Sequence, residues 1–252
     1  MRKKYCIDLS EEKSIVYEVI QENELHILVK GLYYRIIKNL DIENVKYLNE
    51  DDIEKYRREN EDYYKKIKEN MFSLRVKGIL GSVLHIDGDK EYMENCLELY
   101  KEMGIHAYGI YMNEDDIPKK VGSIVRKLLP DIVVITGHDY YNKEGLTDLD
   151  NYKNTRNFME SCLEARRNKS DVIIIAGACQ SNSEALLISG ANYASSPKRI
   201  NIHTYDPAII AVKAASTSFE RFIDKNSLER KIESFKEAYI GVETKGKMKV
   251  LI

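Results

Sequence analysis

Alternation between strand-like and helix-like segments constrains the fold of this chain most. After residue 74, apolar runs of strand length occur at residues 79–86, 106–111, 132–136 and 172–176, with weaker runs at 191–194 and 200–203. Segments with helical periodicity lie between them, at residues 90–103, 116–129, 149–166 and 181–189. Because strands that alternate with helices form βαβ units, the sequence predicts an α/β fold with a mostly parallel sheet and helices on both faces.

The first 48 residues follow a different pattern. Runs rich in β-branched and aromatic residues, at 14–20, 24–29 and 32–38, are separated at hairpin spacing, which predicts a small antiparallel, barrel-like β unit over residues 1–48. Residues 50–71 then carry charges of both signs at helical spacing, so residues 49–73 are expected to form a charged helical linker. Residues 74–252 remain for the α/β domain.

Charge and hydropathy exclude several classes of protein. The 39 basic and 41 acidic residues give a formal net charge of -2, so no global field attracts nucleic acid or an anionic membrane. No apolar run approaches the length of a bilayer span, and we expect a soluble, cytoplasmic protein without a membrane partner. The cysteines lack the spacing of a metal site or a disulfide framework, which favours free thiols at Cys6, Cys96, Cys162 and Cys179.

Two of the apolar runs end in residues that can do chemistry. The stretch DIVVITGHD (131–139) places His138 just after one predicted strand, and DVIIIAGACQS (171–181) places Cys179 just after another. The carboxyl ends of parallel strands meet at the sheet edge where catalytic groups gather. The separation of 41 positions holds about one βαβ unit, so the two strands are expected to be neighbours. A thiol beside an imidazole is the arrangement of a cysteine nucleophile and its base.

The residues around Cys179 fit that chemistry. Gly177 and Ala178 leave room for a sharp turn, and a helix that begins near Ser181 would direct free backbone N–H groups toward the sulfur. This setting is expected to lower the thiol pKa from its ordinary value of about 8.5. The backbone N–H groups of Ala178 and Gly137 are candidate donors to the oxyanion of a tetrahedral intermediate.

Other interpretations of the same residues remain open. A single cysteine or histidine at a strand end is usually a packed or hydrogen-bonded structural residue. The helix after Cys179 could form the anion site of a non-catalytic binding module. Cys179, His138 and His203 could hold zinc in a metal-dependent hydrolase, although the sequence has no CxxC or HxxxH spacing. No glycine-rich nucleotide-binding loop follows any predicted strand, and we expect neither a metal nor a cofactor.

A series of longer motifs resembles a known family. The motifs are VLHIDGD (83–89), DIVVITGHD (131–139), AGACQS (176–181), GANYASSPKRINIHTYDP (190–207) and GVETKG (241–246). They run in order from about Val76 to the end of the chain and resemble the sporulation-specific peptidase family YabG of endospore-forming bacteria. The resemblance implies a cysteine peptidase that trims spore coat and cortex-associated proteins, in the mother cell or at the spore coat. It implies that His138 and Cys179 are the catalytic pair, and it implies nothing for residues 1–48.

A looser similarity links the chain to the caspase, legumain, gingipain and clostripain group. The steps Gly137-His138 and Ala178-Cys179, each after an apolar block, are similar to the pattern of that group. The sheet is therefore expected to be flavodoxin-like or caspase-like. The glycine that usually follows the histidine in that group is Asp139 here.

Members of this wider group read one side chain before the scissile bond, often through a charged residue. The first strand of the α/β part ends at Asp87 and Asp89, and in a flavodoxin-like order it lies beside the strand that carries His138. Asp87 or Asp89 is therefore a candidate pocket for Arg or Lys. The alternative is a turn at Asp87 and a helix N-cap at Asp89. Ser195 is a further candidate for substrate contact, with a structural turn at residues 195–197 as the alternative.

Overall fold

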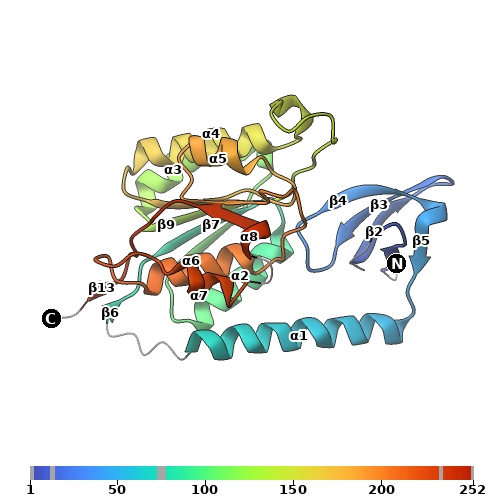
Figure 1. The fold of residues 1–252 in the computed structure, drawn as a ribbon, viewed down its shortest axis with the longest axis horizontal. Coiled ribbons are helices and arrows are strands. Elements are labelled where there is room, and N and C mark those ends of the chain that lie inside the picture. The colour runs from blue at the N-terminus through green and yellow to red at the C-terminus, as the bar shows by residue number, and fades with distance from the viewer. Residues whose placement is uncertain (1–2, 12–14, 73–77, 233–234, 251–252) are drawn as a thin grey trace.

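The computed structural model describes residues 3–11, 15–72, 78–232 and 235–250. A small sheet formed by the first part of the chain lies beside a larger, helix-covered sheet, and a long helix runs along both (Figure 1). The mixed α/β class expected from the sequence is confirmed. The predicted strand start at Ser14 and the predicted boundary at residues 73–74 lie outside the described residues.

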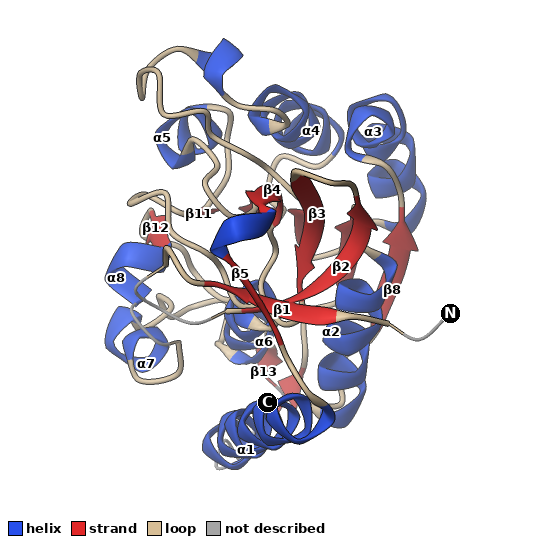
Figure 2. Cartoon of the chain, turned by 90° about the vertical axis from the view of Figure 1, so that its right-hand side faces the viewer, coloured by secondary structure: helices blue, strands red, loops and turns tan. Residues whose placement is uncertain are grey.

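The small sheet is antiparallel, with the strand order β4-β3-β2-β1-β5. Its strands are β1 (Tyr5–Asp8), β2 (Val16–Glu22), β3 (His26–Gly31), β4 (Ile37–Asp41) and β5 (Val45–Tyr47), with the 3-10 helix η1 (Ile42–Asn44) before β5. Tyr17, Ile27 and Val29 are fully buried, so apolar side chains of β2 and β3 pack into the interior. Figure 2 looks onto this sheet, with the long helix below it.

The strand predicted at residues 32–38 is wrong over its first half. β4 begins only at Ile37, because residues 33–35 leave the sheet and pair elsewhere. Arg35 donates its backbone N–H to Ile202 O (3.0 Å), and Tyr34 forms an antiparallel bridge with His203. The β propensity of this run is therefore satisfied by a segment far away in the sequence, which local spacing cannot reveal.

Helix α1 (Glu50–Phe72) confirms the charged helix predicted at residues 50–71. Its first turn is acidic, which interacts favourably with the positive end of the helix dipole. Ile53 and Ile67 are buried, whereas most of the charged side chains between them remain exposed to solvent. In Figure 1, α1 runs beneath both the small sheet and the α/β part.

The large sheet has the strand order β12-β11-β10-β9-β7-β8. Its strands are β7 (Val83–Asp87), β8 (Ala107–Tyr111), β9 (Ile132–Thr136), β10 (Ile173–Ala176), β11 (Tyr193–Ser195) and β12 (Tyr239–Gly241). Neighbours are parallel except for β11 and β12, which are antiparallel. β7 lies between β8 and β9, as the flavodoxin-like order predicts, and β9 lies beside β10.

Helices cover both faces of the large sheet (Figure 1). One side carries α2 (Lys90–Glu102), α6 (Asp206–Ser216) and α7 (Lys225–Glu229), and the other carries α3 (Ile117–Leu128), α4 (Thr155–Asn168) and α5 (Ser183–Ile188). Val134 and Ile175 belong to the apolar cluster that includes α6, and Val133 and Ile174 belong to the cluster that includes α4. Strands buried on both faces explain why the apolar runs are unbroken.

Some predicted boundaries differ from the structure. The run at 79–86 divides into β7 and the short strand β6 (Gly78–Ile79), which pairs with β13 (Lys249–Val250). The run at 200–203 is not a strand of the sheet, and residues 149–166 divide into the 3-10 helix η3 (Leu149–Asn151) and α4. The sequence did not predict α6, α7, α8 (Phe235–Ala238) or β12. α6 is apolar and buried almost all round, so amphipathic periodicity does not mark it.

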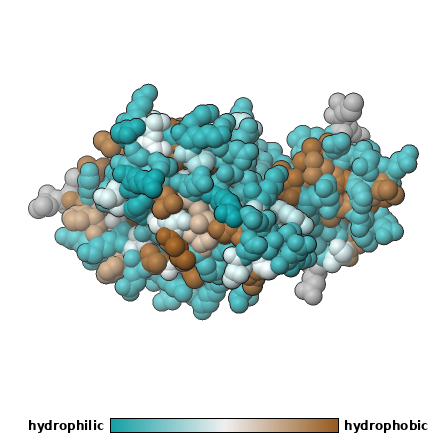
Figure 3. Space-filling view, turned by 90° about the horizontal axis from the view of Figure 1, so that it is seen from above, coloured by the Kyte–Doolittle hydropathy of each residue, from teal (hydrophilic) through white to brown (hydrophobic). Residues whose placement is uncertain are grey.

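The surface of the molecule is mostly hydrophilic when seen from above, and hydrophobic side chains gather there in small patches (Figure 3). Within the ranges that the structure describes, no helix combines the length and the apolar character needed to cross a membrane.

Candidate active site

Strands β9 and β10 bring the loops of His138 and Cys179 together. The strands pair in parallel, with Ile135 opposite Ala176. His138 and Cys179 therefore follow matched positions at the carboxyl edge of the sheet. Thr136 Oγ1 donates a hydrogen bond to the backbone oxygen of Gly177 (2.9 Å), which ties the two strand ends to each other. The neighbouring strands expected from the sequence are found.

Cys179 is fully buried. The backbone N–H of Ile202 donates to its Sγ (2.9 Å), and the thiol faces the Ile202 oxygen at 3.7 Å. Burial raises the pKa of the Cys179 thiol to about 12, although the Ile202 N–H and the charge of Arg35 oppose that rise. The expected lowering of this pKa is wrong for this conformation. The short helix α5 begins only at Ser183, and desolvation of the thiolate outweighs any dipole effect.

His138 lies between two carboxylates. Its Nδ1 is 3.4 Å from Glu114 Oε1, and its Nε2 is 3.6 Å from Asp89 Oδ2. The His138 backbone is held as well, because its N–H donates to Glu114 Oε1 (2.8 Å) and its oxygen accepts from Asn154 Nδ2 (2.7 Å). Nε2 is buried and makes no hydrogen bond to the residues that the structure describes. Glu114 therefore holds the Nδ1 side of the ring, and the Nε2 side faces Asp89.

Glu114 is a candidate site residue that sequence reasoning missed. It begins the 3-10 helix η2 (Glu114–Asp116), shortly after β8. Burial alone would raise the pKa of the Glu114 carboxyl, but hydrogen bonds from His138 lower it below its ordinary value. A Cβ at Gly137 would lie 2.5 Å from Glu114 Oε1, so glycine at 137 permits this close approach. A signal was present, because the rule that site residues follow parallel strands applies equally to β8.

Asp139 joins the loop of His138 to the loop of Cys179. Its carboxylate is buried and accepts hydrogen bonds from the backbone N–H groups of Tyr140 and Asn154 and from the hydroxyls of Thr155 and Ser181. Burial raises the pKa of this carboxyl, and the hydrogen bonds oppose the rise. Where the caspase-like group usually has a glycine, this chain therefore has a side chain that holds the two loops in register.

The two candidate oxyanion donors have different surroundings. The Ala178 N–H donates to Ser181 Oγ (3.0 Å), so this amide is engaged inside the turn after β10. Gly137 lies at the end of β9, against Glu114. Gly177 has a φ of +104°, and a Cβ there would lie 2.5 Å from Ser195 Oγ, so the turn requires glycine at that position. The oxyanion role of Ala178 and Gly137 stays a prediction.

Asp87 is a fully buried carboxylate at the end of β7. Its Oδ2 lies 2.5 Å from Arg35 Nη1 and 3.3 Å from His85 Nε2. Burial alone would raise the pKa of Asp87, but the Arg35 guanidinium holds it well below its ordinary value, so the carboxylate stays charged. A dry, charged carboxylate that binds a guanidinium has the chemistry expected of an acidic pocket. In this conformation the guanidinium belongs to the chain itself.

Asp89 and Ser195 have structural roles in this conformation. Asp89 is the N-cap of α2, where its Oδ1 accepts from the Tyr92 N–H (3.1 Å), and its Oδ2 pairs with Lys30 Nζ (2.7 Å). The N-cap that was the alternative for Asp89 is therefore present. Ser195 is fully buried and donates its hydroxyl to the Ala178 oxygen (2.9 Å). Substrate contact by either residue stays a prediction.

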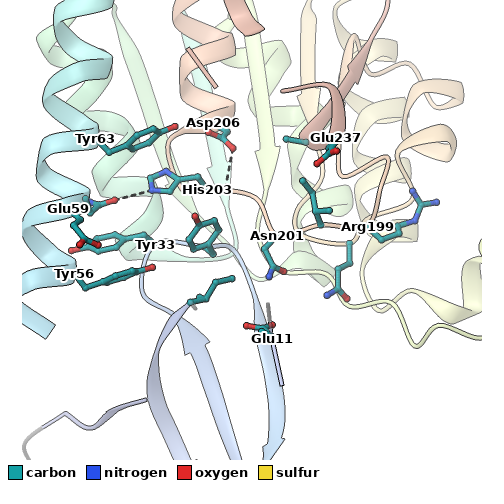
Figure 4. Close-up of a pocket in the computed structure, with 16 residues that line it drawn as sticks. Glu11, Tyr33, Tyr56, Glu59, Tyr63, Arg199, Asn201, His203, Asp206 and Glu237 are labelled. Atoms are coloured by element: carbon teal, nitrogen blue, oxygen red, sulfur yellow. Dashed lines mark hydrogen bonds between the residues drawn. The ribbon is translucent and has the colours of Figure 1, made fainter. Parts of the chain in front are cut away.

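A cavity of about 830 Å³ opens beside these loops, between the small sheet, α1 and the α/β part (Figure 4). Its lining includes the aromatic residues Tyr33, Tyr56 and Tyr63 and the polar residues Gln180, Asn201 and Glu237. Gln180 adjoins Cys179 in the chain, so the cavity reaches the candidate site without including the buried sulfur itself.

The zinc alternative would place His203 with Cys179 and His138. His203 instead donates from Nε2 to Asn60 Oδ1 (3.0 Å), and its ring packs on Tyr63. Over residues 3–11, 15–72, 78–232 and 235–250, no group of three or more His, Cys, Asp or Glu residues could hold a metal ion.

Comparison with known proteins places this chain in a peptidase family. The family model described as YabG peptidase U57 matches residues 1–252, and the chain therefore belongs to that family. It is 39% identical over 175 residues to the sporulation-specific protease YabG of Bacillus subtilis (strain 168). This alignment covers 68% of the chain and 60% of the length of that relative. The resemblance seen in the motifs is confirmed, and the family match also includes the residues before Val76.

Proposed function

We propose that this chain is a cysteine endopeptidase that cleaves proteins after arginine or lysine. The observation that carries the proposal is the position of Cys179 and His138 after matched ends of the neighbouring parallel strands β9 and β10, in a member of a peptidase family. Glu114 adds support, because nucleophilic catalysis needs a group that orients the base, and its carboxylate lies against Nδ1 of His138.

In the proposed reaction, Cys179 Sγ attacks the carbonyl carbon of the scissile peptide while His138 accepts the thiol proton. Backbone N–H groups at the two strand ends, with Gly137 and Ala178 as candidates, stabilise the oxyanion. His138 then gives the proton to the leaving amine, and water hydrolyses the thioester to restore the thiol. Because burial raises the pKa of the Cys179 thiol to about 12 here, the sulfur must become more accessible before the attack.

The preference for basic residues is assigned to Asp87 rather than to Asp89. Asp87 already binds a guanidinium at 2.5 Å in a dry environment. Asp89 is engaged by the first turn of α2 and by Lys30. An ionised, desolvated carboxylate favours a bidentate or charge-assisted partner strongly over a neutral side chain.

The substrates and the location are proposed from the family. The relative from Bacillus subtilis is named as a sporulation-specific protease. We accordingly propose spore coat or cortex-associated proteins as the substrates, and the mother cell or the spore coat as the place of action. Neither proposal rests on a side chain of the site.

Peptide cleavage by the purified protein tests this function. The wild type is expected to cleave peptides after Arg or Lys but not after Glu, and Cys179→Ala is expected to abolish cleavage. Cys162→Ala is the matched control, because Cys162 is also fully buried but packs among the helices on one face of the sheet. Cleavage that persists in Cys179→Ala would refute the mechanism. Loss of cleavage to a chelator but not to thiol alkylation would indicate the metal-dependent hydrolase instead.

A further inference from the structure

A fully buried arginine from the turn between β3 and β4 reaches into the α/β part. Arg35 has an exposed fraction of 0%. Its Nη1 lies 2.5 Å from Asp87 Oδ2, and its Nη2 donates to the Thr204 oxygen at 3.0 Å. The guanidinium carbon is 5.4 Å from the centre of the Tyr92 ring. Burial of a charged side chain is costly unless partners surround it, so these contacts define a formed binding site for a guanidinium.

The backbone before Arg35 is bound as an added strand. The Thr204 N–H donates to the Tyr33 oxygen (3.0 Å), and the Arg35 N–H donates to the Ile202 oxygen (3.0 Å). Between these bonds, Tyr34 and His203 form an antiparallel bridge. Extended peptides commonly bind proteins in this way, with main-chain hydrogen bonds for affinity and a side-chain pocket for specificity. Residues 33–35 therefore have both components of peptide recognition.

Cys179 lies against the segment with which the added strand pairs. Ile202, whose oxygen accepts from Arg35, donates its own N–H to Cys179 Sγ at 2.9 Å. The backbone of Arg35 is also among the groups that oppose the burial-induced rise of the thiol pKa. The side chain of Arg35 thus pairs with Asp87 while its backbone lies beside Cys179. A substrate that is cleaved after arginine is expected to bind in the same way.

Residues 30–34 also contact the residues that surround His138. Lys30 pairs with Asp89 Oδ2 (2.7 Å), and this same oxygen lies 3.6 Å from His138 Nε2. Tyr92, whose ring packs on His138, donates its hydroxyl to the oxygens of Gly31 and Tyr34. The part of the chain that leaves β3 therefore contacts the surroundings of both candidate catalytic residues.

After Arg35 the chain turns back instead of continuing across the site. The Ile36 N–H donates to the Tyr34 oxygen (2.8 Å), which closes a tight turn centred on Arg35. The Gly31 N–H donates to the Ile36 oxygen (2.9 Å), which returns the chain to the small sheet. The segment is thus bound like a substrate on one side of Arg35 and held by its own sheet on the other.

We propose that residues 33–36 occupy the substrate position of the active site, with Arg35 in the pocket for the side chain before the scissile bond. The small sheet (β1–β5), which carries this segment, is then an internal, substrate-like inhibitor, and a protein substrate binds only after the segment leaves. This inference rests on the proposed peptidase function where it assigns a substrate position. The contacts of Arg35 do not depend on that function.

Native thiol labelling tests the proposal without an activity assay. Iodoacetamide labelling of Cys179, followed by mass spectrometry, is expected to be at least about tenfold faster in Arg35→Ala, because each 1.4 kcal/mol of lost docking raises the open fraction tenfold. Arg35→Lys keeps the charge but loses the planar fork, so an intermediate rate is expected. Arg57→Ala, at a more exposed arginine of α1, is the matched control with an unchanged rate. Labelling of Cys162, in the opposite cluster, reports global unfolding.

The tripeptide acetyl-Tyr-Tyr-Arg-amide copies residues 33–35. We expect it to slow the labelling of Cys179 in Arg35→Ala. The same peptide with Glu in place of Arg is expected to leave the labelling rate unchanged. Two results together overturn the proposal. In Arg35→Lys, with Cys162 still protected from iodoacetamide, Cys179 is labelled at the wild-type rate. In addition, the arginyl peptide does not slow the labelling of Cys179 in either variant. Faster labelling without peptide cleavage by any variant would support the occupied site and contradict the peptidase function. Cleavage of peptides by the wild type as fast as by the Arg35 variants would contradict the inhibitor.

Discussion

The two carboxylates beside the His138 ring, those of Asp89 and Glu114, have different partners and therefore different roles. Asp89 is paired with Lys30 and caps α2, so its charge is largely engaged elsewhere. Glu114 contacts both the Nδ1 and the backbone N–H of His138, and hydrogen bonding lowers the pKa of its carboxyl in spite of burial. We therefore infer that Glu114 is a positioning residue, which acts on the reaction through His138 rather than by touching the substrate.

Replacing Glu114 separates these roles. In Glu114→Gln we expect kcat for arginyl peptides to fall about 10- to 100-fold while KM changes little, since an orienting group contributes through the imidazole. Steady-state kinetics measures this split. Asp115→Asn, at the neighbouring exposed residue, is the control and should leave kcat unchanged. A rise in KM without a loss in kcat would assign Glu114 to substrate binding instead.

At the scale of elements, the turn between β10 and α5 determines where Cys179 lies. Gly177 has a positive φ, and the turn is held by the hydrogen bonds of Ala178 with Ser181 and Ser195. The turn thus presents the sulfur toward Ile202, on the segment that pairs with residues 33–35. A glycine is needed at 177 because Ser195 of the neighbouring strand β11 approaches closely.

Two glycine substitutions distinguish backbone strain from steric crowding. Gly104 has a φ of +69° and nothing within 4 Å of an added Cβ, so Gly104→Ala should lower the free energy of unfolding by about 1 kcal/mol. Gly177→Ala adds a clash with Ser195 Oγ at 2.5 Å, and we expect a loss of at least about 2 kcal/mol together with lower peptidase activity. Urea denaturation of both variants measures the difference. Equal losses would show that the turn can relax.

At the scale of the whole molecule, the small sheet and the α/β part share one apolar cluster. Tyr17, Val29 and Ile36 from the small sheet belong to the same cluster as Cys179 and Ile202. We therefore propose that the three segments predicted from the sequence are functional parts that fold together, namely residues 1–48, 49–73 and 74–252. Removal of the small sheet would expose apolar surface, so single substitutions at Arg35 are the better way to open the site.

Deletion of residues 1–48 is accordingly expected to lower the thermal unfolding midpoint and to promote aggregation, because the apolar partners of the small sheet become exposed. Differential scanning calorimetry and size-exclusion chromatography of the shortened chain measure both effects. A monomeric fragment with an unchanged midpoint would show that the two parts are energetically independent.

Acid is expected to weaken the whole structure through paired carboxylates. For Asp8, Asp87 and Glu102, burial alone would raise the pKa, but basic partners lower it in the folded state. Their stabilisation is therefore present above the unfolded pKa values of about 4 and is lost as the pH falls through the lower folded values. The urea midpoint should fall steadily as the pH is lowered from about 5 toward 2. A constant midpoint over this range would contradict these pairings.

Sequence reasoning succeeded for local patterns and failed for contacts between distant segments. Residues 132–136 were predicted with their observed bounds, because a strand buried on both faces is an apolar run whatever surrounds it. Residues 33–35 were assigned to the small sheet, since their β propensity does not reveal which segment they pair with. Glu114 follows β8, which makes it a candidate by the rule for parallel strands, but its contact with His138, 24 residues away, exists only in the folded chain.

By itself, the sequence determined the α/β class, the neighbouring strands before His138 and Cys179, and the family. These features follow from the periodicity of side chains along single segments and from continuous motifs. The tertiary structure decided that Glu114 lies against His138, that burial raises the pKa of the Cys179 thiol, and that Arg35 pairs with Asp87. Those features depend on desolvation and on charges brought together from separate elements, and such effects exist only once the chain has folded.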